Sequence, residues 1–398
     1  MMIKRCLSVC CAAVLTLLSA FAFAGEEFTV ADIHIEQLEL PDNEAIAFTQ
    51  GMKAGWNLGN TFDAVDCAWL SDGLYYESAW VGVMTMPYLF DTLKDAGFGA
   101  VRIPVSWRNH VSGDDYTIDA AWLARVREVV GYALDRGLYV IVNTHHDVEA
   151  DYLFPDDAHL DQSIWYLTSI WWQVAEAFRE QGDRLVFEGM NEPRLKGTNI
   201  EWWLNPRDLK SSEAVRCVNA LNQAFVDTVR AAGGENATRY LMIPGYDASP
   251  DGALRKDFAM PTDSAGNRLI VSVHAYTPYA FALQADNESG STSAFDPAKQ
   301  RDRAEIDRLM QSLYDKYIEN GIPVVIGEYG ARDKGGNLKD RADFVAYYVA
   351  AAGARGILCF IWDNHAFTGG GELFGLLDRN NNTFVYPEIL QSMMAYVR

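Results

Sequence analysis

The chain has 398 residues, of which 49% are hydrophobic and 12% aromatic, and its formal net charge at pH 7 is −21. This length allows one large domain or two domains of ordinary size, and the apolar content is enough for a large core. The strongly negative charge argues against nucleic acid and anionic membrane surfaces as partners, because both would repel the protein.

The first 24 residues have the pattern of a secretory signal peptide. Lys4 and Arg5 precede a mostly apolar stretch, and Ala-Phe-Ala at 22–24 forms a small-residue cleavage site before Gly25. The stretch is short for a membrane span, and no second long apolar stretch follows it. We therefore predict that residues 1–24 are removed and that the mature chain is secreted, into either the periplasm or the extracellular medium.

Two further features bound the mature chain. Residues 25–50 are acidic and are expected to form an irregular lead-in to a single domain at 51–398. Cys67, Cys217 and Cys359 are odd in number, are far apart, and lie in no Cys-x-x-Cys pattern. We expect buried thiols, and a single disulfide with one free thiol is the alternative.

Short runs rich in Val, Ile and Phe recur along the domain and are typical of buried parallel strands. They predict strands at 53–58, 100–104, 139–144, 185–187, 240–243, 269–273, 324–326 and 357–361. Apolar residues at helical spacing lie between them and predict helices at 120–136, 163–181, 213–232, 297–320 and 339–352.

Eight strands alternating with helices favour an α/β fold, the (β/α)8 TIM barrel, as one domain. A doubly wound open sheet is the alternative. It is weakened because no glycine-rich phosphate loop follows the first strand.

Polar and aromatic residues gather where the predicted strands end. They are Arg102, His145, Asn191, Glu192, His274, Tyr276, Glu328 and Trp362. The carboxyl ends of the strands form one rim of a barrel, where barrel enzymes keep their chemistry. The opposite rim shows no such concentration, so packing explains the group poorly.

Glu192 and Glu328 each follow a strand-like apolar run, a costly place for a carboxylate unless it has a function. Cleavage of a glycosidic bond with retained configuration needs two carboxyl groups, one ionised and one protonated. Arg102 and Tyr276 can donate to Glu328 and lower its pKa. Burial close to a second carboxylate would raise the pKa of Glu192.

Other interpretations of single residues remain open. Arg102 could be a buried partner for any carboxylate at this rim, and His274 and Trp362 could be core residues. His145 and His146 are neighbours that point to opposite sides of a strand, so at most one should face the site. A metal site at the two histidines is a further alternative, although no third residue has ligand spacing.

The motifs at these strand ends resemble glycoside hydrolase family 5, a family of endoglucanases and mannanases. They are Gly-Trp-Asn-Leu-Gly-Asn at 55–60, Val-Arg-Ile-Pro at 101–104, Asn-Thr-His-His at 143–146, Glu-Gly-Met-Asn-Glu-Pro at 188–193, His-Ala-Tyr at 274–276, Gly-Glu-Tyr-Gly at 327–330 and Phe-Ile-Trp-Asp at 360–363. They run in family order from about residue 51 to the C-terminus. The first motif, and Leu-Leu-Asp-Arg-Asn at 376–380, look like subfamily 4, which contains endo-β-1,4-glucanases and xyloglucanases.

The resemblance implies a function for each of these residues. Glu192 corresponds to the acid/base and Glu328 to the nucleophile. The supporting set implied by the family is Arg102, His145, Asn191, His274, Tyr276 and Trp362. Asn60 and Asp63, on the first loop, are weaker candidates for binding the non-reducing side of the substrate.

The sequence therefore predicts a secreted, retaining endo-β-1,4-glucanase whose partner is a β-glucan polysaccharide or oligosaccharide. The same machinery could act on xyloglucan, mixed-linkage glucan, xylan or mannan, because specificity resides in the loops at 196–209 and 277–293. Trp69, Trp202 and Trp203 are candidate substrate contacts. We expect a monomer that needs no metal and no organic cofactor. A non-catalytic sugar-binding barrel and a metal-dependent hydrolase are the alternatives from other classes.

Overall fold

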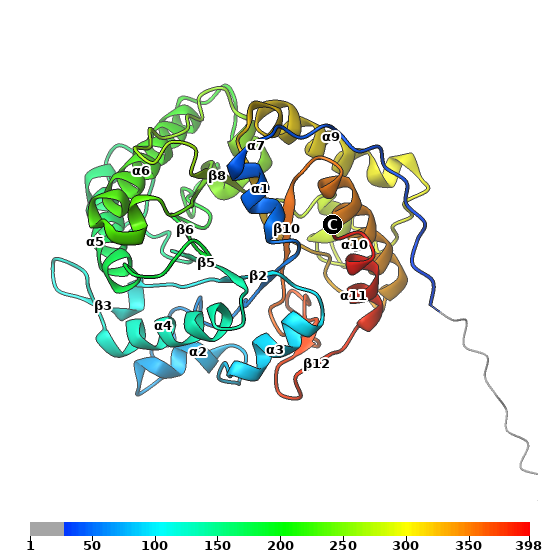
Figure 1. Ribbon diagram of the computed structural model, residues 1–398, viewed down its shortest axis with the longest axis horizontal. Coiled ribbons are helices and arrows are strands. Elements are labelled where there is room, and N and C mark those ends of the chain that lie inside the picture. The colour runs from blue at the N-terminus through cyan, green and yellow to red at the C-terminus, as the bar shows by residue number, and fades with distance from the viewer. Residues whose placement is uncertain (1–27) are drawn as a thin grey trace, which may run out of the picture.

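The structure, a computed structural model, describes residues 28–398. The predicted signal peptide lies outside these residues. Parallel strands form a closed eight-stranded barrel in the order β1-β10-β9-β8-β7-β6-β5-β2, surrounded by helices (Figure 1). The strands are β1 (Gly55–Asn57), β2 (Ala100–Ile103), β5 (Tyr139–Asn143), β6 (Leu185–Glu188), β7 (Leu241–Pro244), β8 (Leu269–His274), β9 (Val324–Tyr329) and β10 (Leu358–Ile361). The prediction of a (β/α)8 barrel is confirmed.

Two of the strands that continue past their predicted ends bring a glutamate into the barrel. Strand β6 extends to Glu188, which pairs with Asn143 of β5, and β9 extends to Tyr329 and contains Glu328, which pairs with His274 of β8. Parallel pairing with a longer neighbour keeps these residues extended although they are not apolar. Glu188 and Glu328 therefore lie within the barrel wall and not in the loops beyond it.

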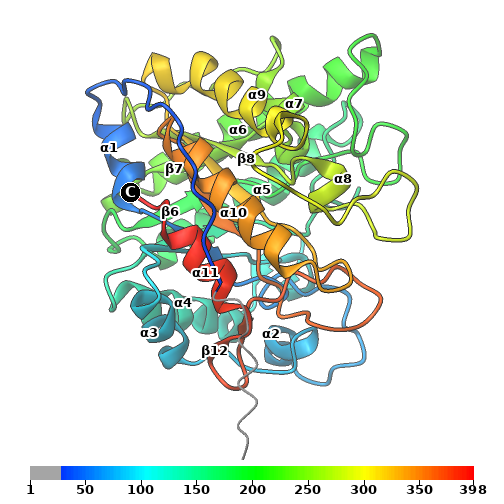
Figure 2. The same ribbon diagram turned by 90° about the vertical axis from the view of Figure 1, so that its right-hand side faces the viewer.

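Helices cover the outside of the barrel and follow the predicted alternation (Figures 1 and 2). They are α3 (Pro87–Asp95), α4 (Ala120–Leu134), α5 (Leu160–Ala177), α6 (Leu209–Ala232), α7 (Pro250–Leu254), α9 (Gln300–Lys316), α10 (Leu338–Gly353) and α11 (Pro387–Met394). In α4 the Asp119 side chain caps the N-terminus by accepting from the Trp122 N–H, and Trp122, Val126 and Val129 are buried. Helix α9 is shorter than the predicted 297–320, since it begins at Gln300 and ends at Lys316.

The segment before the barrel contains a helix, in contrast to the expected irregular lead-in. Helix α1 (Glu44–Gly51) begins at Asn43, whose side chain accepts from the Ala45 and Ile46 N–H groups. Phe48 stacks on Tyr240 with ring centroids 3.7 Å apart, and Ala45 packs into the inner cluster of the barrel. Figure 2 shows α1 at the end of the molecule opposite α8 (Tyr279–Ala282). The helix is stabilised by covering the N-terminal end of the barrel, which an eight-residue local pattern does not reveal.

Further elements complete the chain. Short hairpins are formed by β3 (Val111–Ser112) with β4 (Thr117–Ile118), and by β11 (Leu377–Asp378) with β12 (Thr383–Phe384). Helix α2 (Tyr76–Ala79) is a single turn. Among residues 28–398, no helix has the length and apolar character needed to cross a membrane.

The three cysteines of the described chain are buried free thiols. This confirms the expected thiols, and the alternative of a disulfide among them is wrong.

Candidate active site

A fully buried arginine, Arg102 of β2, lies at the centre of the site. Its Nε donates to Glu188 Oε2 at 2.7 Å, and its Nη1 donates to Glu328 Oε1 at 2.8 Å. Its Nη2 donates to Asn191 Oδ1 at 2.6 Å. A buried guanidinium needs such acceptors to offset the loss of its hydration. Nη1 also donates to Asn57 Oδ1 at 3.0 Å. Arg102 thereby fixes four side chains, which come from β1, from β6, from the loop after β6 and from β9.

The two glutamates singled out from the sequence face each other across His274. His274 Nδ1 lies 2.9 Å from Glu192 Oε1 and 3.6 Å from Glu328 Oε1. One oxygen of each carboxylate and one ring nitrogen of His274 all lie within 4.8 Å of one another. Tyr276 donates its hydroxyl to Glu328 Oε2 at 3.0 Å. Both carboxylates are largely buried, with side-chain exposures of 18% for Glu192 and 6% for Glu328.

The pKa shifts of the two glutamates run opposite to the sequence-based expectation. Burial raises the pKa of Glu192, but the hydrogen bond with His274 and the positive charges of His274 and Arg194 outweigh it and lower the pKa to about 2. Burial also raises the pKa of Glu328, the charges of His274 and Arg102 oppose it, and the net direction is upward. The physical reason is that His274 lies closer to Glu192 than to Glu328. The arrangement therefore holds the pKa of Glu328 above that of Glu192.

Glu188 is a third carboxylate in this cluster, and sequence analysis did not single it out. Besides Arg102, it accepts from Asn143 Nδ2 at 3.0 Å and from Ser272 Oγ at 2.5 Å. It is fully buried. The sequence signal for Glu188 is its position at the end of an apolar run, four residues before Glu192.

The remaining predicted residues of the set lie beside this cluster. The His145 ring is parallel to the indole of Trp362, with centroids 6.0 Å apart, and His145 Nδ1 contacts Asn143 Nδ2 at 3.0 Å. Burial lowers the pKa of His145 well below its usual value and that of His146 to about 4, so both rings are neutral near pH 7. His146 is only partly buried and lies toward the outer part of the site, with its ring 6.0 Å from that of Trp80.

The first loop places Asn60 and Asp63 differently from one another. Asp63 is fully buried, and its carboxylate accepts from the Asn60 N–H at 2.9 Å and from the Thr61 N–H at 2.5 Å. Asp63 therefore holds the loop from inside, which corrects its expected role as a substrate contact. Asn60 is partly exposed and has a φ of 60° in the left-handed region, so it remains a candidate contact.

Among residues 28–398, two groups of three side chains have potential ligand atoms close enough to surround a cation. One is Glu192, His274 and Glu328, and the other is Asp63, His145 and His146. The fold thus supplies a third residue, Asp63, beside the two histidines, although the sequence spacing indicated none. Its oxygens already accept from two backbone N–H groups, and Arg102 places a positive charge beside the first group.

Exposed aromatic side chains line the loops around the site. Trp202 and Trp203 follow β6 and are 49% and 66% exposed, and Trp203 meets Tyr279 edge to face at 6.2 Å. Trp69 in the first loop region is 71% exposed. Phe281, by contrast, is buried against Phe295 and Phe344 and belongs to the core. Broad apolar faces of this kind can stack on sugar rings.

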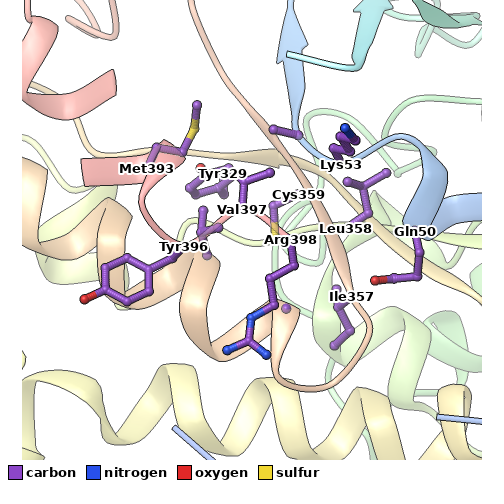
Figure 3. Close-up of a pocket in the computed structure, with 13 residues that line it drawn as sticks. Gln50, Lys53, Tyr329, Ile357, Leu358, Cys359, Met393, Tyr396, Val397 and Arg398 are labelled. Atoms are coloured by element: carbon purple, nitrogen blue, oxygen red, sulfur yellow. The ribbon is translucent and has the colours of Figure 1, made fainter. Parts of the chain in front are cut away.

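A separate hollow lies between the barrel wall and the last two helices. Figure 3 shows Lys53, Cys359, Met393 and Tyr396 among the residues lining it. It contains none of the carboxylates described above, and its lining is a mixture of barrel and C-terminal residues. It is a gap under the helix layer and not part of the candidate active site.

Comparisons with known proteins agree with the barrel fold. The family model "Cellulase (glycosyl hydrolase family 5)" matches residues 61–368. Endoglucanase 1 of Ruminococcus albus is 40% identical over 379 residues, which cover 94% of this chain and 87% of the relative.

Two solved structures are also similar. A variant of the family 5 lichenase from Caldicellulosiruptor sp. F32, in complex with cellotetraose, is 52% identical, with a TM-score of 0.93 and coverage of 94% of this chain and 100% of that chain. A GH5-4 broad-specificity endoglucanase from Ruminococcus champanellensis with bound cellotriose is 42% identical, with a TM-score of 0.81 and coverage of 90% and 100%. The family model matches most of the chain, and the relatives are similar over nearly its whole length. The chain therefore belongs to glycosyl hydrolase family 5 and is a glycoside hydrolase.

Proposed function

We propose that the chain is a secreted, retaining endo-β-1,4-glucanase in which Glu328 is the nucleophile and Glu192 the acid/base. One observation carries the mechanism: oxygens of Glu192 and Glu328 approach within 4.8 Å, with His274 between them. Retaining enzymes hold the two carboxyl groups about 5–5.5 Å apart, and inverting enzymes leave about 6.5–9.5 Å for a water molecule. The short separation supports direct attack on the sugar.

In the first step Glu328 attacks the anomeric carbon and a covalent glycosyl–enzyme forms. The hydrogen bonds from Arg102 and Tyr276 hold the carboxylate in place for attack. Glu192 protonates the leaving oxygen at the same time. The supporting residues Asn191, His145 and Trp362 would contact the sugar beside the bond that is cleaved.

The proton must be on Glu192 when this step begins, whereas the pKa of Glu192 lies below that of Glu328. His274 Nδ1 contacts both carboxylates, and its pKa is raised because Glu328 and Glu192 outweigh the effect of burial. His274 can therefore pass a proton between them when substrate binds. In the second step the ionised Glu192 removes a proton from water, which releases the sugar with retained configuration.

Similarity to endoglucanases supports β-1,4-glucan as the substrate, and a second candidate is mixed-linkage β-glucan. The observation that favours it is the 52% identity to the lichenase. Xyloglucan, xylan and mannan are compatible with the same catalytic residues. The predicted signal peptide at 1–24 supports secretion, and we propose that the mature chain acts as a monomer.

The decisive experiment measures reducing-sugar release by the mature chain and by Glu328→Gln. Carboxymethylcellulose, lichenan, xyloglucan, xylan and mannan are compared with and without a chelator. We expect the variant to lose at least about a thousandfold of kcat, because the attacking oxygen is replaced by an amide. Chelator is expected to have no effect. The matched control is Glu319→Gln, on a 3₁₀ turn outside the site, which should retain full activity.

A folded Glu328→Gln variant with unchanged activity would refute the nucleophile assignment. Inactivity of the wild-type chain on all five polysaccharides would favour the sugar-binding alternative, and loss of activity with chelator would favour a metal-dependent hydrolase. The order of rates on the five substrates distinguishes the glucanase from the lichenase proposal. The anomer released, observed by NMR during hydrolysis, tests retention directly.

A further inference from the structure

An arginine that belongs to neither the predicted set nor the Arg102 cluster contacts the acid/base candidate. Arg194 Nη1 lies 3.2 Å from Glu192 Oε2 and donates to the Glu192 backbone carbonyl at 3.0 Å. Its side chain is only 9% exposed. The two carboxylate oxygens of Glu192 therefore have different cationic neighbours, His274 at Oε1 and Arg194 at Oε2.

The loop after β6 holds this arginine in place. Glu201 Oε1 accepts from Arg194 Nε at 3.4 Å, and Glu201 Oε2 accepts from the Gly197 N–H at 2.8 Å. The Arg194 guanidinium lies over the Trp202 ring at 4.1 Å from its centroid. A stacked and paired guanidinium has few alternative positions, so its charge remains beside Glu192.

We propose that Arg194 is a positioning residue that orients the Glu192 carboxylate and stabilises its ionised form, which is the form that acts as base in the second step. This inference rests on the proposed double-displacement function. The acid/base must be protonated in the first step and ionised in the second. A fixed positive charge favours the second step and opposes the first. Arg194 therefore sets the balance between the two half-reactions.

Other charged or titratable groups also act on Glu192 and remain unchanged in the test. From the surrounding strands and loops they are His146, Asp247, His274, Tyr276, Glu328 and Glu372. Arg194 differs from these groups because it lies in the same segment as Glu192. It is held there by Glu201 of the loop after β6. Its removal should thus change the electrostatics of Glu192 without altering the barrel strands.

The test compares Arg194→Leu with wild type on two aryl β-cellobiosides over a range of pH. A 2,4-dinitrophenyl leaving group departs without protonation, so kcat reports the second step and requires ionised Glu192. A phenyl leaving group needs the acid, so kcat/KM requires protonated Glu192. We expect both Glu192-dependent limbs to move to higher pH by at least about one unit, because an opposite charge at this distance is lost. The rate of the second step near the acidic limb should fall about tenfold.

Controls separate this role from a structural one. Arg194→Lys keeps the charge and should return the limbs toward their wild-type positions. Arg179→Leu removes an exposed arginine paired with Glu176 and should change neither limb. Circular dichroism confirms folding of each variant. A folded Arg194→Leu variant whose rates fall equally at every pH, or do not fall, would overturn the inference. Inactivity of wild type, or full activity of Glu328→Gln, would instead overturn the proposed function.

Discussion

At the residue scale, one buried cation organises four carboxylate and amide side chains. Arg102 is shared between Glu188 and Glu328, so the charge available to Glu328 depends on how strongly Glu188 competes for it. Asn143 and Ser272 fix Glu188 from the opposite side. Glu188 is thus linked to the nucleophile candidate through Arg102. Removing one member of such a buried network strongly destabilises the protein, because it leaves another charge without its partner.

Glu188→Gln tests this arrangement. Removal of the Glu188 charge leaves Arg102 to act more strongly on Glu328, so the pKa of Glu328 should fall and the acidic limb of kcat/KM should move to lower pH. We expect kcat/KM at the optimum to fall about tenfold to a hundredfold, because the guanidinium is less well positioned. A pH profile on an aryl cellobioside provides the measurement.

Ser272→Ala is the matched control for Glu188→Gln. It removes the hydroxyl that donates to Glu188 Oε1 but leaves the charges in place. The acidic limb should therefore not move, and a smaller loss of kcat/KM is expected. If Glu188→Gln retains the wild-type limb, Glu188 has no electrostatic influence on Glu328.

At the element scale, the loop after β1 sits directly against the loop after β10. A Cβ added to Gly59 would lie 2.8 Å from the Trp362 ring and 2.9 Å from the Asp363 carbonyl oxygen. Gly59→Ala should therefore push Trp362 out of position, destabilise the protein by about 1–3 kcal/mol and raise KM. Denaturant titration and steady-state kinetics measure the two effects.

Gly131→Ala is the matched control, because no heavy atom lies within 4 Å of the Cβ it adds on α4. It should stabilise the protein by up to about 1 kcal/mol through helix propensity, with unchanged kinetics. Wild-type KM in Gly59→Ala would show that Trp362 tolerates the displacement or does not bind substrate.

Asp63, in the loop after β1, is expected to make the stability of the protein depend on pH. Burial raises the pKa of Asp63 to about 7, although backbone N–H groups and Arg379 oppose the shift. Between the unfolded value of 3.8 and about 7, the folded protein binds a proton that the unfolded chain has released. The contribution of Asp63 to the free energy of unfolding is therefore largest below this window. It falls as pH rises through the window, by at most about 1.4 kcal/mol per pH unit.

Asp63→Asn should remove this slope, because an amide does not titrate. The free energy of unfolding in urea, measured for both proteins from pH 4 to pH 8, provides the check. We expect wild type to lose stability relative to the variant as pH rises. Parallel curves would show that Asp63 titrates near its unfolded value.

At the scale of the whole molecule, the two ends of the barrel serve different purposes. The carboxyl end holds the charged cluster, and the other end is covered by α1 with Phe48 stacked on Tyr240. Phe48→Ala should destabilise the protein by about 2 kcal/mol, since Phe48 is partly buried. It should leave kcat/KM of the folded enzyme unchanged. A loss of activity without a loss of stability would contradict this separation of the two ends.

The sequence by itself determined the barrel and the position of most of its chemistry. Buried parallel strands are continuous apolar runs, so all eight were visible, and a polar residue after such a run marks the carboxyl end. Glu192, Glu328, Arg102, His274 and Tyr276 were found in this way and lie together in the structure.

Only the tertiary structure decided which neighbours each charge has. It buried Asp63, brought Glu188 to Arg102 and Arg194 to Glu192, and placed His274 closer to Glu192 than to Glu328. It also folded α1 against the barrel end. The reason is physical: apolar periodicity is a local property of the chain, whereas burial and electrostatic interactions depend on side chains that are up to hundreds of residues apart in sequence.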